Sequence, residues 1–65
     1  MHDASTFHEA AEERRLWADY YEAAARALEI MRAEGTSRSA LARILAEDAK
    51  ASAAMKRIKE IRGIR

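Results

Sequence analysis

Apolar residues in the first half of the chain recur at alternating spacings of three and four, the period of one face of an α-helix. A first series, interrupted by Arg14, contains Phe7, Ala10, Trp17, Tyr21, Ala24, Leu28 and Met31. A second series with the same spacing contains Leu16, Tyr20, Ala23, Ala27 and Ile30. At about 100° per residue the two series lie roughly 110° apart, so more than half of the helix circumference is apolar. One partner helix is too narrow to cover both.

Polar residues and glycines predict where the helices begin and end. Thr6 and Glu9 have the spacing of a capping box, which places a helix start near residue 6. Gly35 can adopt the left-handed conformation that ends a helix, and Gly63 can do the same near the end of the chain. The chain contains no proline and no strand-like alternation. We therefore expect one all-α domain over residues 1–65, an antiparallel helical hairpin with helices over about 6–34 and 38–62 and a turn at 35–37.

The second helix carries a single narrower apolar row. Its members are Leu41, Ile44, Asp48, Ala51, Met55 and Ile58, flanked by Leu45 and Ile61. In an antiparallel hairpin, residues whose numbers sum to about 72 face each other, so Trp17 would meet Met55 and Met31 would meet Leu41. This register predicts that the first series packs against the second helix within the chain.

The second series would then be left open for another chain. An exposed apolar row is costly in water, and a second copy of the hairpin could cover it. We therefore expect a homodimeric four-helix bundle with an interface formed by Leu16, Tyr20, Ala23, Ala27 and Ile30. The alternative is a three-helix, helix-turn-helix-like form, in which the second helix breaks at residues 46–50 and folds back over this series. In that form, residues 39–45 and 51–61 resemble the two helices of the DNA-binding motif.

Charge is distributed unevenly along the chain, although the net charge is only +1. Residues 1–34 hold eight acids and four arginines, whereas residues 35–65 hold eight bases and three acids. Such a distribution indicates either an anionic partner or attraction between the two helices. The candidate nucleic-acid-binding residues, which would contact the backbone of a duplex, are Arg43, Lys50, Lys56, Arg57, Lys59, Arg62 and Arg65.

Few residues suggest catalysis. The run from His8 to Glu12 resembles a zinc-protease motif, but Glu12 stands where that motif has its second histidine. The 65-residue chain contains no cysteine, which excludes disulfides and thiol chemistry. We therefore expect no enzymatic activity, catalytic residue, metal, cofactor or small-molecule substrate.

No segment is long and apolar enough to span a bilayer, and residues 1–6 have neither the basic start nor the apolar core of a signal peptide. These features predict a cytoplasmic protein without a membrane partner.

Residues 6–20 resemble the opening helix of a group of small phage and mobile-element proteins that includes a type I-E anti-CRISPR protein. The matching residues are Thr6, Phe7, Ala11, Glu12, Arg15, Leu16, Trp17 and Tyr20, with Glu13 and Asp19 as acidic matches. The group turns after the position of Tyr20, whereas this chain continues its helical pattern. The resemblance implies inhibition of a CRISPR effector by binding to a protein surface. Two functional hypotheses follow: a small regulatory or accessory protein that contacts nucleic acid, and an inhibitor that binds a protein.

Overall fold

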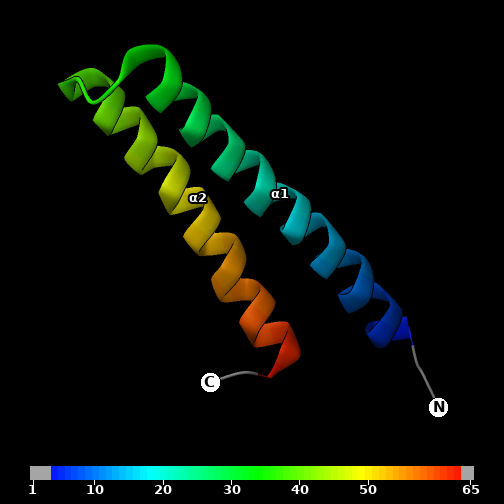
Figure 1. The fold of residues 1–65 in the computed structure, drawn as a ribbon. Helices are drawn as coiled ribbons and strands as arrows, with labels where there is room; N and C mark the ends of the chain where they lie inside the picture. The colour runs from blue at the N-terminus through cyan, green and yellow to red at the C-terminus, as the bar shows by residue number, and fades with distance from the viewer. Residues whose placement is uncertain (1–3, 64–65) are drawn as a thin grey trace.

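The chain folds into two antiparallel helices that lie side by side (Figure 1). The computed structural model describes residues 4–63, with α1 spanning Ala4–Glu34 and α2 spanning Arg38–Arg62. The hairpin is elongated, with extents of 52 × 20 × 12 Å. Within the described residues there is no strand, so the predicted all-α hairpin is confirmed.

Local backbone and side-chain chemistry sets the turn and the ends of α2. Gly35 has a φ of 68° and donates its N–H to the Met31 carbonyl at 2.9 Å, which ends α1. The side chain of Ser37 accepts a hydrogen bond from the N–H of Ala40 at 3.2 Å and caps α2. Gly63, with a φ of 73°, ends α2 in the left-handed conformation. These contacts confirm the turn at 35–37 and the second helix over 38–62.

Two other local expectations are wrong. Within the described residues α1 extends to Ala4, so the helix begins at least two residues before the predicted start near residue 6. α2 continues through residues 46–50 without interruption, which excludes the three-helix, helix-turn-helix-like alternative for this structure. An unbroken helix keeps the apolar row of α2 on one face. No glycine or proline lies in that row to break it.

The helix-to-helix contact uses the second series of α1, which corrects the predicted packing. Ala23 and Ala27 are buried and Leu16, Tyr20 and Ile30 are half-buried against α2. From α2, the buried residues are Ala40, Ile44, Ala54 and Ile58. Among the residues whose burial is described, four of the six buried ones are therefore alanines. Small side chains let the two helix backbones approach closely, which favours this series over the bulkier first series.

The first series instead lies largely on the surface. The exposed large hydrophobic residues define what we call the outer face: Phe7 (70% exposed), Tyr21 (64%), Leu28 (59%), Met31 (42%), Leu41 (44%) and Leu45 (65%). The predicted intrachain contact between Met31 and Leu41 therefore does not bury either residue. The predicted row of α2 is likewise rotated, because Asp48 is exposed and Glu47 is half-buried.

Candidate functional site

The outer face combines residues from both helices on one side of the hairpin. On α2, Leu41 and Leu45 begin a row that continues at spacings of three and four through Asp48, Ser52, Met55 and Lys59. A shallow groove on this side is lined by Tyr20 of α1 together with the later residues of that row. On α1, the first series lies roughly 110° from the second series, which faces α2. The two rows of the outer face therefore flank the same groove.

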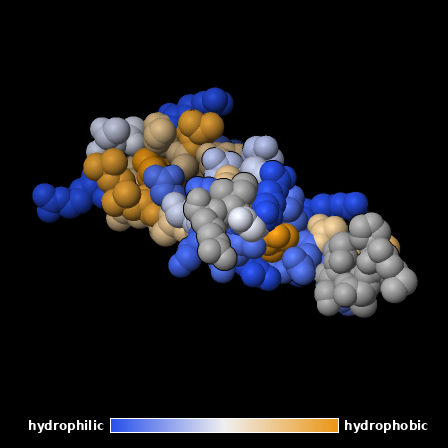
Figure 2. All heavy atoms as spheres, turned by 90° about the horizontal axis from the view of Figure 1, so that it is seen from below, coloured by the Kyte–Doolittle hydropathy of each residue, from blue (hydrophilic) through white to orange (hydrophobic). Residues whose placement is uncertain are grey.

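Hydrophobic side chains on this surface are concentrated toward the turn. Leu28 and Met31 lie in the last turns of α1, and Leu41 and Leu45 lie in the first turns of α2. In the space-filling view, orange spheres gather toward the turn end of the molecule, on the left, while blue spheres dominate elsewhere (Figure 2). The outer face thus has an apolar half near the turn and a mixed half near the open end of the hairpin.

An aromatic cluster connects this face to the helix-to-helix contact. Trp17 stacks on Tyr21 with ring centroids 5.8 Å apart, and Tyr20 meets both rings edge-on, at 5.9 Å from Trp17 and 5.6 Å from Tyr21. Trp17 donates its Nε1–H to Glu13 at 3.3 Å, and the Arg62 guanidinium lies 5.7 Å from the Trp17 ring centre. The half-buried Trp17 is therefore held on several sides, whereas its neighbour Tyr21 projects into solvent.

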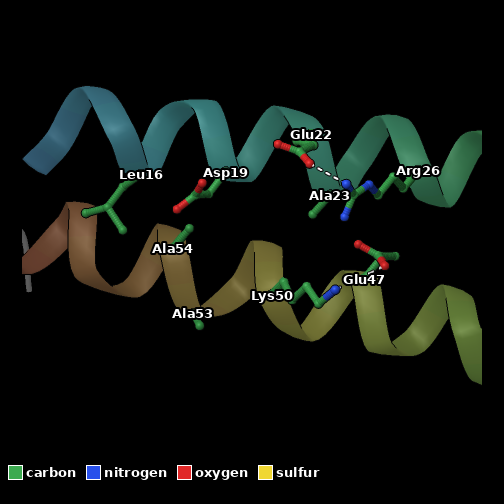
Figure 3. Close-up of a pocket in the computed structure, with 9 residues that line it drawn as sticks. All are labelled: Leu16, Asp19, Glu22, Ala23, Arg26, Glu47, Lys50, Ala53 and Ala54. Carbon is green, nitrogen blue, oxygen red and sulfur yellow. Dashed lines mark hydrogen bonds and ion pairs between the residues drawn. The ribbon is translucent and has the colours of Figure 1, made fainter.

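The opposite side of the hairpin has a different character. A groove there is lined by Leu16, Ala23 and Ala54 at its floor and by charged residues at its rims (Figure 3). Glu22 pairs with Arg26 one helical turn away, and Lys50 pairs with Glu47 at 3.3 Å. These local pairs are typical of a solvated helix surface. No group of three or more metal-ligating side chains is found within residues 4–63.

Most of the basic residues predicted to bind nucleic acid are engaged within the chain. Arg57 donates to both carboxylate oxygens of Glu12, at 2.9 and 3.0 Å, and Arg62 donates to both oxygens of Glu13, at 3.3 and 3.0 Å. Arg43 likewise donates to Glu34, with a distance of 2.7 Å to Oε1. Together with the pair that Lys50 forms, four of the seven predicted residues have an acidic partner.

The remaining three basic residues differ from these four. Lys56 and Lys59 are exposed, and neither forms an ion pair within the described part of the chain. Arg65 lies outside the described residues. The structure therefore brings only Lys56 and Lys59 together as a pair of unneutralised charges near the end of α2.

The ion pairs at the open end persist at neutral pH. The hydrogen bond from Arg57 holds the pKa of Glu12 below its ordinary value of 4.5, against the opposing effect of desolvation. The hydrogen bond from Arg62 likewise lowers the pKa of Glu13. The same contacts raise the pKa values of the two arginines. Three acids of α1 therefore pair with arginines of α2, namely Arg43, Arg57 and Arg62.

Sequence reasoning assigned the two apolar series of α1 to the wrong partners. It placed Leu28 and Met31 inside the hairpin and left Ala23 and Ala27 open, whereas the structure exposes the first pair and buries the second. One available signal could have corrected this. Glu13 and Glu34 extend the second series at its own spacing of three and four, and both acids reach arginines on α2.

No helix within residues 4–63 has a stretch of the length and apolarity needed to cross a membrane. Comparison of the chain with protein-family models, with curated proteins and with solved structures finds no match.

Proposed function

We propose that this chain is a non-enzymatic helical module that binds a protein chain through its outer face. The observation that carries the proposal is the exposure of six large hydrophobic residues, contributed by both helices of the hairpin. Four of them, Leu28, Met31, Leu41 and Leu45, lie near the turn, and exposed apolar residues gathered in this way are typical of protein interfaces. The ion pairs that engage four of the basic residues weaken the competing nucleic-acid hypothesis.

The thin core of the hairpin supports the same proposal. Ile44 and Ile58 are the only buried side chains larger than alanine among the residues whose burial is described. A 65-residue chain without disulfides depends on such a core or on a partner for its stability. Full burial of a leucine or methionine stabilises by about 1.5–3 kcal/mol. A partner on the outer face would therefore add free energy of burial that the small core does not supply.

The partner should present an apolar helix surface with a polar rim. Spacings of three and four on both rows suit the packing of helices into each other's grooves. Asp48 and Lys59 would lie at the edge of such a contact and would select partners with complementary charges. The resemblance of residues 6–20 to the anti-CRISPR-containing group would make a CRISPR effector one candidate partner, and that identity rests on the resemblance alone.

Site-specific photo-cross-linking in the producing cells tests this function. Benzoylphenylalanine in place of Leu45 should cross-link the chain to a protein, because Leu45 lies on the outer face. The matched control places the same photoreactive residue at Ala53, which is exposed on α2 and lines the groove on the opposite side of the hairpin. Equal cross-linking at the two positions, or none at Leu45, would contradict the proposal.

A second candidate function is contact with a nucleic-acid backbone through Lys56 and Lys59. These exposed lysines form no ion pair within residues 4–63, and they lie one turn apart near the basic end of α2. We expect a gel shift with duplex DNA or RNA that weakens steeply as salt rises and is lost in Lys56→Glu combined with Lys59→Glu. Lys50→Glu, at a lysine already paired with Glu47, is the control. Absence of a shift at low salt would exclude this function.

A further inference from the structure

We infer that the protein that occupies the outer face is a second copy of this chain, packed with both turns at the same end of a four-helix bundle. This inference rests on the proposed function, because it names the partner of the same surface. It differs from the bundle expected from the sequence, which used the second series. In the structure the second series is committed to the contact between α1 and α2.

The amount of exposed surface matches what a dimer of this size would cover. The chain exposes 5294 Å². A compact monomer of 7.3 kDa exposes about 4,200 Å² by the scaling of surface with mass, so the hairpin shows about 1,100 Å² in excess. A standard interface buries about 800 Å² on each partner. Self-association through the outer face would therefore bring the exposed surface of each chain close to that of an ordinary globular protein.

A second copy is a partner that is present wherever the protein is made. The hairpin buries mainly alanines, so its own folding depends on surface that another chain covers. The outer face provides two parallel rows of apolar positions, one on each helix, and a matching pair of rows on a second hairpin completes a bundle. A two-fold dimer uses the same patch on both copies, so no further complementary surface is required.

The uneven distribution of apolar residues selects the orientation of the two copies. The row on α2 begins with Leu41 and Leu45 near the turn and reaches Lys59 near the open end. If the two turns lay at opposite ends, the leucines of one copy would pack near the lysines of the other. With both turns at the same end, the apolar halves meet and the lysines stay near the solvated end.

In this orientation α1 of one copy faces α2 of its partner. Leu28 and Leu45 lie at similar heights along the hairpin, because each is about ten residues or fewer from the turn. Leu28 of one chain would therefore approach the partner's Leu45. Ser52, near the middle of α2, would face α1 of the partner copy and stay away from the partner's Ser52.

Sedimentation equilibrium over a concentration series tests the identity of the partner. The wild-type chain should be a dimer at micromolar concentration. Leu28→Glu combined with Leu45→Glu should raise the dissociation constant at least about 100-fold, since two large apolar contact positions are changed on both copies. Ala33→Glu combined with Ala53→Glu adds the same charge at exposed positions that line the grooves on the opposite side of the hairpin, and it should leave the dimer intact.

The possible outcomes separate this inference from the proposed function. A fully helical wild-type monomer at high micromolar concentration would overturn the second copy as partner, while cross-linking of Leu45 to a foreign protein would still support the proposed function. A dimer that survives the paired glutamate substitutions would count against both. Circular dichroism at each concentration detects loss of folding, and recovery of helix in the glutamate variant only at high concentration would support coupled folding and dimerisation.

Disulfide trapping tests the orientation without a loss of folding. The chain contains no cysteine, so each introduced thiol is unique. A mixture of Leu28→Cys and Leu45→Cys chains should yield the mixed disulfide-linked dimer on mild oxidation. Ser52→Cys alone should yield little. Efficient Ser52→Cys dimers without the mixed product would overturn the same-end arrangement.

Discussion

The two apolar series of α1 differ in side-chain size, and that difference accounts for where each lies. The second series, which faces α2, has alanines at its centre, whereas the first series carries Trp17, Tyr21, Leu28 and Met31. Alanines allow close approach of two backbones, and bulky residues offer more area to a partner that comes from outside. Hydrophobicity alone therefore identifies apolar surface without indicating which surface is covered within the chain.

The largest expected effect comes from Ile58, a large side chain that is almost fully buried between the helices. Ile58 is 1% exposed, so Ile58→Ala should lower the free energy of unfolding by about 2–5 kcal/mol through lost burial and a residual cavity. Urea unfolding followed by circular dichroism measures the change. Leu45→Ala on the outer face is the comparison. Its effect should grow with protein concentration if the outer face is an interface, whereas that of Ile58→Ala should appear at every concentration.

Enlarging the centre of the second series should have a smaller effect. Ala27 is buried where the helices approach, so Ala27→Leu should destabilise the hairpin by about 1–3 kcal/mol by forcing the helices apart. Ala25→Leu, at an exposed position of the same helix, should change stability by less than about 0.5 kcal/mol. Thermal unfolding of the two variants gives the comparison. Equal effects would show that close approach at Ala27 is unimportant.

The smallest expected effect concerns pH at the open end. The pKa values of Glu12 and Glu13 are lower in the folded chain than the ordinary 4.5, so their ion pairs stabilise the fold fully above that value. This stabilisation is lost as the pH falls below 4.5 and passes through the folded-state pKa values. The wild-type melting temperature should therefore fall more between pH 6 and pH 3 than that of Glu12→Gln combined with Glu13→Gln. Identical pH profiles would contradict the contribution of these pairs.

The sequence was sufficient to predict the elements of this fold. Gly35, Ser37 and Gly63 have side-chain and backbone preferences that act over one helical turn, so the turn and the limits of α2 follow from local chemistry. The helical spacing of apolar residues is likewise a local property. The start of α1 was missed, because Thr6 and Glu9 have capping-box spacing but lie within a longer helix.

The rotation of each helix about its axis could not be predicted in the same way. Two apolar series about 110° apart give α1 two plausible faces, and the choice depends on packing against α2 as a whole. Glu12 pairs with Arg57 and Glu13 pairs with Arg62, and in both pairs the partners lie far apart in sequence. Both ion pairs form when the second series faces α2. The predicted interface was placed on the wrong series for the same reason. The outer face consists of the large apolar residues that the contact between α1 and α2 leaves exposed.

The order of the ion pairs along the hairpin has a consequence for the kinetics of its folding. Glu34 and Arg43 are nine residues apart, whereas Glu13 and Arg62 are 49 residues apart. Closing the shorter loop costs less chain entropy, so the helices should associate from the turn and separate first at the open end. Trp17 lies at that open end, next to both Glu13 and Arg62. Its fluorescence would therefore report the earliest step of unfolding, before the helices part near Ile44.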